Sequence, residues 1–270
     1  MPTRPVLRWH GGKWMLAPWI IANLPPHRIY VEPFGGAASV LMRKPRAYAE
    51  VYNDLDMEVV NLFQVLRDKD QASELCRLLS LTPFAREEFA QAYTPSEDPL
   101  ERARRLVIRA YMGFGSNGHQ RLTGFRNNTR RTGSAPAHDW ANYPECLQAF
   151  TERLRGVVIE SRDALEIVAQ QDSPETLFYV DPPYVAETRD SGRDYAHELD
   201  EQGHKDLANL LHKVKGMVVV SGYPCPLYDE QLFSGWHRVE REALADGAKK
   251  RTEVLWINDA AMSKRWGLAL

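Results

Sequence analysis

Residues 177 to 184 read Leu177-Phe178-Tyr179-Val180-Asp181-Pro182-Pro183-Tyr184. The first half is a short apolar run typical of a buried strand, and the second half is a polar corner. Ligands of open α/β sheets bind where the strands end. The two prolines remove two backbone donors and leave the carbonyl groups of Asp181 and Pro182 as acceptors. Together with the ring of Tyr184, these groups suit a flat ring that carries an amino group.

Apolar runs of strand length recur on both sides of this corner, and helical periodicity separates most of them. This alternation predicts an α/β fold with a mostly parallel sheet of roughly seven strands. The expected strands are 29–33, 47–53, 157–160, 177–180, 217–221, 237–243 and 253–257, and helices are expected at 15–24, 37–43, 164–170 and 202–214.

The pattern changes between about Asn61 and Leu154, where helical segments follow one another without strands between them. They cover 59–67, 72–79, 87–93 and 100–112, and a loop rich in Gly, Asn, Thr and Arg follows from 113 to 133. We therefore predict a sheet domain made of residues 1–60 and 155–270, with residues 61–154 inserted as a mainly helical domain that ends in a basic hairpin or loop. A chain of 270 residues is long enough for one core with such an insertion.

Arginine is concentrated in the second half of this insertion. Eight arginines and no acidic residue occur between Arg102 and Arg131, although the chain as a whole has a net charge of −2. Such segregation is typical of a polyanion site. A solvated basic helix would explain the arginines from 102 to 109 but not those in the loop. The candidate contact residues are Arg109, Asn117, Arg121, Arg126, Arg130 and Arg131.

Several classes of protein are disfavoured by the composition. The three cysteines, at 76, 146 and 225, have neither disulfide nor metal spacing, and we find no zinc motif. The N-terminus lacks the apolar region of a secretion signal, and the apolar segment 14–24 contains Pro18 and Asn23 and is too short to span a bilayer. We expect a cytoplasmic protein that binds neither a metal nor a membrane.

A second strand end carries the residues expected to hold a cofactor. In Val31-Glu32-Pro33-Phe34-Gly35-Gly36 a strand runs into two glycines before a helix, and this opens the backbone around Phe34 and Gly35 to a close ligand. Asp54 follows Gly35 by nineteen residues and closes the next strand, where a carboxylate can accept two hydrogen bonds from a ribose diol. The alternative is that Asn53-Asp54 forms a turn or caps the helix that starts near Met57.

Two further segments have a structural and a functional interpretation. Asp163 lies between an expected strand and helix, so an N-cap is the default and a contact to an adenine amine is the sharper hypothesis. Trp9-His10-Gly11-Gly12-Lys13 combines an aromatic ring, two glycines and a cation, and it is equally compatible with a surface turn.

These motifs, in this order, resemble the Dam-type DNA adenine-N6 methyltransferases. The resemblance covers nearly the whole chain, and the insertion differs most from better-known members. It is carried by Arg8-Trp9-x-Gly11-Gly12-Lys13, Glu32-Pro33-Phe34-x-Gly36, Asn53-Asp54, the basic insertion, Asp181-Pro182-Pro183-Tyr184 and Val219-Val220-Ser221.

The resemblance implies a Rossmann-like methyltransferase fold that binds S-adenosylmethionine. It implies that Trp9, Lys13 and Asp54 contact this cofactor and that Asp181 lies where the cofactor and the target base meet. The insertion is then the target-recognition domain of an enzyme that methylates double-stranded DNA, as in restriction–modification, and that acts as a monomer. The expected catalytic set is Asp181, Pro182, Pro183 and Tyr184.

The corner explains how such a reaction can proceed. An adenine amine is a poor nucleophile because its lone pair is delocalised, and two acceptors, the Asp181 carboxylate and the Pro182 carbonyl, can orient it. The base must leave the duplex, and Tyr184 can stack on it; the alternative for Tyr184 is a partly buried ring. An N-methyltransferase of RNA or of a protein amide, and a DNA-binding relic without activity, remain alternatives.

Overall fold

The structure is a computed structural model that describes residues 1–118, 121–128, 135–189, 197–244 and 250–266. The chain divides into two compact units. The helical unit comprises Met1–Trp14, Gly36–Arg43 and Asp56–Arg155, and the sheet unit comprises Met15–Gly35, Lys44–Leu55 and Gly156–Leu270. Residues 1–14 and 36–43 thus group with the helices, although the sequence assigned them to the sheet domain.

The sheet unit is built on seven strands in the order β3-β2-β1-β4-β5-β7-β6. Pairing is parallel from β3 to β5, whereas β7 is antiparallel to both β5 and β6. The strands are β1 (Ile29–Glu32), β2 (Ala49–Asn53), β3 (Val157–Glu160), β4 (Thr176–Val180), β5 (Met217–Gly222), β6 (His237–Leu244) and β7 (Lys250–Ile257). The predicted α/β fold with a mostly parallel seven-stranded sheet is confirmed.

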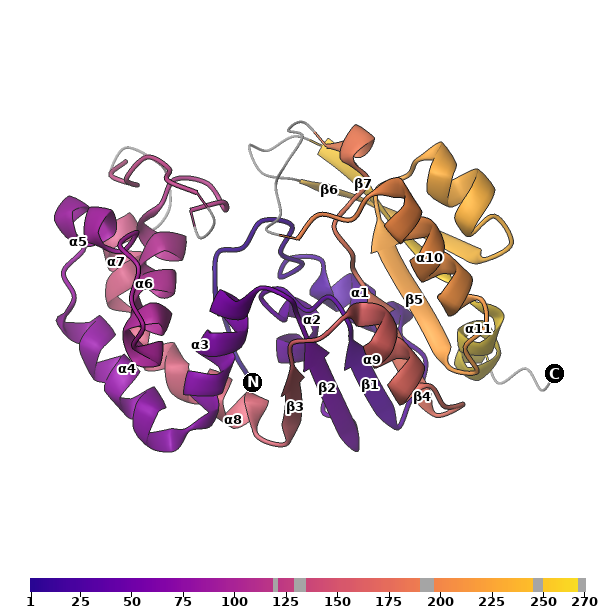
Figure 1. Cartoon of the computed structure of the whole chain (residues 1–270), viewed down its shortest axis with the longest axis horizontal. Helices are drawn as coiled ribbons and strands as arrows, with labels where there is room; N and C mark the ends of the chain where they lie inside the picture. Colours follow the sequence, from indigo (N-terminus) through magenta and orange to yellow (C-terminus); the bar gives the residue numbers. More distant parts are fainter. Residues whose placement is uncertain (119–120, 129–134, 190–196, 245–249, 267–270) are drawn as a thin grey trace. The chain divides into compact units, whose positions relative to one another are not determined.

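Helices of the sheet unit cover the sheet (Figure 1), and two of them begin at an aspartate cap. They are α1 (Ala17–Asn23), α9 (Ala164–Gln171), α10 (Glu201–Leu211) and α11 (Asp259–Trp266), with short helical turns at Ala186–Thr188 and Leu227–Leu232. Asp163 caps α9 by accepting from the Leu165 amide, and Asp200 caps α10 by accepting from the Gly203 amide.

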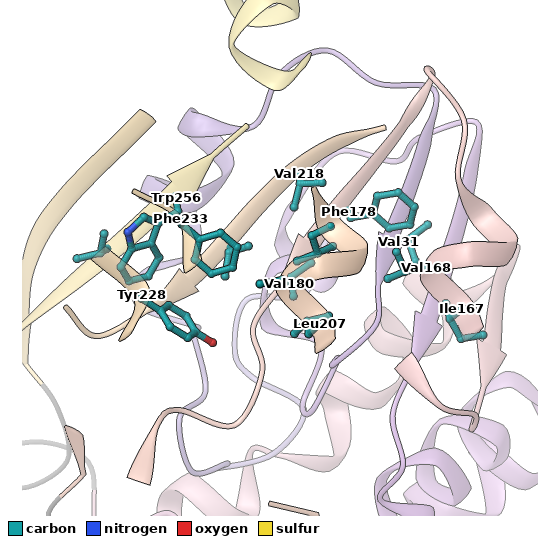
Figure 2. Close-up of a cluster of buried hydrophobic side chains, with 14 of the residues drawn as sticks. Val31, Ile167, Val168, Phe178, Val180, Leu207, Val218, Tyr228, Phe233 and Trp256 are labelled. Carbon is teal, nitrogen blue, oxygen red and sulfur yellow. The ribbon is translucent and has the colours of Figure 1, made fainter. Parts of the chain in front are cut away.

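The hydrophobic core of this unit lies between the sheet and the helices α9 and α10 (Figure 2). Phe178 and Val180 of β4, like Val218 and Val220 of β5, contribute to it and are fully buried. Burial of each such side chain contributes about 1.5–3 kcal/mol. Because strand residues alternate between faces, Tyr179 of β4 and the β5 residue Ser221 point to the opposite face of the sheet.

The helical unit packs around one long helix, α6. Its elements are α2 (Ser39–Arg43), α3 (Met57–Arg67), α4 (Lys69–Leu81), α5 (Arg86–Gln91), α6 (Pro99–Met112), α7 (Pro136–Ala141), a 3₁₀ turn at Pro144–Cys146 and α8 (Leu147–Leu154). Two tyrosine hydroxyls attach the N-terminal segment to these helices: Tyr111 donates to the Pro5 carbonyl and Tyr143 to the Val6 carbonyl, each at 2.7 Å.

No helix in the described part of the chain combines the length and apolarity needed to cross a membrane. Within those same residues, no group of three or more His, Cys, Asp or Glu side chains is placed to hold a metal ion.

Candidate active site and nucleic-acid interface

The polar corner lies where the strand order of the sheet reverses. β1 pairs with β2 on one side and with β4 on the other, so β1 and β4 flank a topological switch point. Ligands of open α/β sheets bind beyond the carboxyl ends of the strands at such a point. Glu32 is the last residue of β1, and Asp181 directly follows β4. Two carboxylates that are distant in sequence therefore belong to neighbouring strand ends.

Asp181 is half-buried and is held by the next strand. The hydroxyl of Ser221, on β5, donates to Asp181 Oδ1 at 2.8 Å. The hydroxyl of Tyr179, on β4, lies 3.0 Å from Ser221 Oγ. The Asp181 carboxylate is thus the end of a hydrogen-bonded chain that starts inside the sheet.

Negative charge surrounds the buried Tyr179. Burial raises the pKa of its hydroxyl well above the ordinary value, and the Asp181 carboxylate acts in the same direction. The carboxylates of Glu32 and Glu253 also raise this pKa, whereas the hydrogen bond with Ser221 lowers it. Three carboxylates close enough to influence one hydroxyl make this end of the sheet suited to a positively charged ligand.

Tyr184 is buried, with 6% of its surface exposed, although the sequence favoured a ring that faces the site. Its hydroxyl donates to Glu253 Oε2 at 2.9 Å, and the ring of Tyr223 packs against it edge to face at 4.6 Å. Tyr184 is buried because of contacts from distant parts of the chain. Glu253 of β7 accepts its hydrogen bond, and Tyr223, directly after β5, covers its ring. A stacking role for Tyr184 stays a prediction.

The cofactor turn after β1 packs tightly on β2. The Gly35 amide donates to the Asn53 carbonyl at 2.8 Å, and a Cβ on Gly35 would lie 2.1 Å from the Tyr52 ring, so no larger residue fits. Phe34 is partly buried against the core cluster. Phe34 and Gly35 were predicted to contact a ligand because the backbone there is open. The structure adds that only glycine fits at position 35, next to the Tyr52 ring.

Asn53 joins the loops that follow three strands. Its side-chain amide donates to the carbonyls of Pro33 and Arg162, and its oxygen accepts from the Arg162 amide, at 2.9–3.0 Å. Asp54, the predicted ribose ligand, follows and is half-buried. The alternative that Asn53-Asp54 caps α3 is wrong, because Asp56 caps this helix by accepting from the Glu58 amide.

Asp163 is exposed and accepts from the Leu165 amide at 2.7 Å. The N-cap interpretation of this residue is confirmed. A contact between Asp163 and an adenine amine stays a prediction.

Trp9 and Lys13 belong to the helical unit. The Gly12 amide donates to the Trp9 carbonyl at 3.1 Å and Gly11 has φ +70°, so residues 9–12 form a tight turn with glycine at its left-handed position. Lys13 is 4% exposed and donates to the Gly11 carbonyl at 2.7 Å. Gly36 has φ +47°, and a Cβ there would lie 2.9 Å from Trp9 Nε1. A turn is therefore present, but its lysine is buried rather than solvated.

The basic helix α6 is neutralised from within its own unit. Glu58 of α3 binds both Arg102 and Arg109, at 2.7 and 2.9 Å, and Glu101 binds both Arg104 and Arg105, each at 2.7 Å. The Arg109 side chain is only 12% exposed. The segment from Arg102 to Arg131 contains no acidic residue, so these partners cannot be seen in it. They come from other helices and from Glu101, which directly precedes the segment.

The other predicted DNA-contact residues lie in the loop after α6 and differ in exposure and in their partners. Arg121 is exposed, whereas Arg126 lies 3.5 Å from Asp139 Oδ2. Asn117 has a buried side-chain oxygen that accepts no hydrogen bond from the described residues. Arg130 and Arg131 lie outside the described residues. Of the predicted contacts in this loop, Arg121 is the described arginine best placed to reach a polyanion.

The residues of the sheet unit fit S-adenosylmethionine. Asp54 directly follows β2, where a carboxylate suits a ribose diol, and Phe34 and Gly35 form a turn in which a side chain on Gly35 would clash. The carboxylates around Tyr179 suit a sulfonium and an ammonium group. Tyr179, Tyr223 and Glu253 were not chosen from the sequence. Glu253 could have been noticed in the sequence, because it is a charged residue directly before the apolar residues 254–257 of an expected strand.

Relatives of known activity match most of the chain. It is 26% identical to the DNA adenine methylase of Escherichia coli K12, over 87% of this chain and 84% of that protein. It is 25% identical to the DNA adenine methylase of Haemophilus influenzae, over 93% and 91% of the two chains. The Type II methyltransferase M1.LlaDCHI of Lactococcus lactis subsp. cremoris is 27% identical, over 94% and 95%.

Residues 9–245 match the family model of the D12 class N6 adenine-specific DNA methyltransferases. The chain belongs to this family of enzymes, which methylate adenine in DNA with S-adenosylmethionine as the methyl donor.

Proposed function

We propose that the protein methylates the N6 amine of an adenine that has been extruded from double-stranded DNA, with the corner 181–184 as its catalytic centre. One observation carries this assignment. The Asp181 carboxylate lies at the carboxyl end of β4, beside the switch point, and a hydrogen bond from Ser221 fixes it there.

Asp181 and the Pro182 carbonyl accept hydrogen bonds from the two hydrogens of the adenine amine. This holds the nitrogen lone pair away from the ring and directs it outward. Bound S-adenosylmethionine supplies a methyl group on a positively charged sulfur. As the amine nitrogen takes the methyl group, the carbon–sulfur bond of the donor would break and leave a neutral thioether. The two acceptors stabilise the positive charge that develops on the nitrogen, and the amine then releases one proton to water. Pro183 keeps the corner rigid, because its ring fixes φ.

The base has to leave the duplex, at a cost of a few kcal/mol. Stacking on an aromatic ring returns about 1–3 kcal/mol per base. Tyr184 is our candidate for this platform. Since its ring is covered by Tyr223 and its hydroxyl is bound to Glu253, stacking requires the Tyr223 ring to move aside.

In this proposal, residues of the sheet unit bind the cofactor. Phe34 and Gly35 contact the adenosine, and Asp54 accepts from the ribose hydroxyls. Asp163 reaches the adenine amine with the carboxylate oxygen that does not cap α9. The roles of Trp9 and Lys13 in cofactor binding rest on the family resemblance, and an ammonium group such as that of Lys13 suits the carboxylate of S-adenosylmethionine.

We assign DNA recognition to the insertion, residues 61–154, and within it to the loop that follows α6. Arg121 and Asn117 are the leading described candidates, and Arg126, Arg130 and Arg131 complete the predicted set. We propose that Arg109 supports the fold instead of contacting phosphate, since Glu58 holds it. We further propose that the protein acts as a monomer in the cytoplasm, as part of restriction–modification.

The test is transfer of a tritiated methyl group to unmethylated duplex DNA. Asp181→Ala should lower the rate by at least about 10³-fold, because an acceptor aimed at developing charge is lost. DNA binding should persist. The matched control is Asp206→Ala, which removes an exposed carboxylate from α10 and should leave the rate unchanged.

Near-normal turnover in Asp181→Ala would refute the assignment of the catalytic centre. Parallel assays with RNA and with protein identify the substrate class, and label in either of them but not in DNA would refute the proposal. Cofactor binding by calorimetry without transfer to any substrate would point to a relic.

A further inference from the structure

A polar chain crosses the sheet behind the catalytic corner. β4 and β5 are parallel neighbours with Tyr179 opposite Val219, and Ser221 follows Val219 on the same face. Tyr179 Oη lies 3.0 Å from Ser221 Oγ, and Ser221 Oγ lies 2.8 Å from Asp181 Oδ1. Tyr179 and Ser221 are 3% and 1% exposed. Two buried hydroxyls therefore lead to the half-buried carboxylate.

The hydrogen bonds in this chain can have only one donor-to-acceptor direction. A serine hydroxyl has one proton, and that of Ser221 is donated to Asp181 Oδ1. Ser221 must then accept from Tyr179. Burial and the Asp181 charge both raise the pKa of Tyr179, so this hydroxyl keeps its proton at any working pH.

We propose that Ser221 and Tyr179 are positioning residues for methyl transfer, which set the plane of the Asp181 carboxylate through a directed hydrogen-bond chain. The Asp181 carboxylate is attached to the backbone through one methylene group and can rotate about that bond, and its lone pairs rotate with it. A donor fixed within the sheet stops this rotation, and the acceptor then keeps its aim at the amine. This inference rests on the proposed catalytic role of Asp181.

The placement of the chain distinguishes it from ordinary core bonding. Thr176 and Ser173 also form a hydroxyl pair, at 2.9 Å, but it lies at the amino end of β4 and ends on the Gln171 carbonyl. The chain from Tyr179 ends on the carboxylate at the switch point. A misplacement of about 1 Å in a catalytic geometry can cost about 10²-fold in rate.

The test is single-turnover methyl transfer with Ser221→Ala, Ser221→Thr and Tyr179→Phe. We expect Ser221→Ala to lower the rate constant by about 10–100-fold, with the affinities for S-adenosylmethionine and DNA within about threefold of wild type. Ser221→Thr keeps the hydroxyl and should restore most of the rate. Tyr179→Phe should have a smaller effect, because it acts through Ser221. Ser173→Ala is the matched control and should leave the rate unchanged.

The double variant Tyr179→Phe/Ser221→Ala should be no slower than Ser221→Ala alone, because one chain has been broken twice. An unchanged rate in Ser221→Ala, or a loss confined to binding affinity, would overturn the inference. If Ser221→Ala does not fold, Tyr179→Phe tests the inference instead, and a wild-type rate in Tyr179→Phe would also overturn the inference. Inactivity of the wild-type protein on DNA would instead refute the proposed function, so the two failures are separable.

Discussion

The ion pair Lys44–Glu50 of the sheet unit and the ion pairs of α6 in the helical unit differ in how deeply they are buried. In the sheet unit, Lys44 and Glu50 form an ion pair at 2.8 Å with side chains only 2% and 3% exposed, and the polar chain to Asp181 is also buried. In the helical unit, the ion pairs of Arg102 and Arg109 with Glu58 join neighbouring helices and stay partly exposed. Buried polar groups of the sheet unit thus lead to the proposed catalytic corner, while the arginines that stand out in the sequence of α6 hold helices together.

This contrast separates two sequence signals of similar strength. The corner 181–184 was selected by its place after a strand, and that place is a property of the sheet. The basic segment was selected by charge density, which ignores partners supplied by other helices. A cluster of basic residues in a sequence therefore has to be compared with the acidic partners that other helices supply before it indicates a binding surface.

The largest effect is expected from breaking the buried ion pair. Lys44→Met leaves the Glu50 carboxylate buried without its cation, and loss of one partner of such a pair costs about 3–5 kcal/mol. Urea unfolding of the whole chain measures this. Lys44→Met/Glu50→Gln should recover much of the loss, because no charge is then buried. A cost below 1 kcal/mol for Lys44→Met would remove the contrast between the units.

A smaller effect is expected from the pH response of His204, which is 2% exposed on α10. Burial, followed by the positive charge of Arg189, lowers the pKa of His204 to about 4, although Asp200 opposes the shift, and Nδ1 lies 3.0 Å from the Tyr228 hydroxyl. The unfolded chain binds the proton from about pH 6.5 downward and the folded chain does not. Stability should therefore be complete above pH 6.5 and fall as the pH drops towards 4, by about 2 kcal/mol at pH 5.

The measurement is the difference in unfolding free energy between wild type and His204→Gln from pH 8 to pH 5. This difference should shrink as the pH falls, because only the wild type loses stability through His204. His237→Gln, at an exposed position on β6, is the control. A difference that is constant with pH would contradict the buried neutral histidine.

In the helical unit, Arg109→Ala should cost about 1 kcal/mol, since partly exposed ion pairs contribute little and the bond to the Ala92 carbonyl adds a share. The slope of log binding constant against log salt concentration for duplex DNA should stay unchanged. A slope that falls by about one would return Arg109 to the DNA interface.

The smallest change in stability is expected for Arg121→Ala, within about 0.5 kcal/mol of wild type, because this side chain is exposed. Here the salt slope should fall in magnitude by about 0.9, the contribution of one phosphate contact. The pair Arg109→Ala and Arg121→Ala thus compares an arginine bound within the fold with one proposed to contact DNA. An unchanged slope for both would place the DNA contacts elsewhere.

The sequence alone determined the element pattern and the family. All seven predicted strands are present, because alternating and continuous apolar runs are local and survive without knowledge of partners. The helices α7 (Pro136–Ala141) and α8 (Leu147–Leu154) were not predicted, since they are short and stabilised mainly by packing. The ordered motifs resemble the Dam-type DNA adenine-N6 methyltransferases, and the match to the D12 class N6 adenine-specific DNA methyltransferases confirms this prediction.

Only the tertiary structure decided which groups meet. It placed Glu253 of β7 on Tyr184, covered that ring with Tyr223, and connected Ser221 to Asp181 across β4 and β5. It also gave the arginines of α6 their acidic partners. The physical reason is that strand order and helix packing bring together residues separated by 40 or more positions, and hydrogen bonds and charges act over distances in space, with no dependence on distance in sequence.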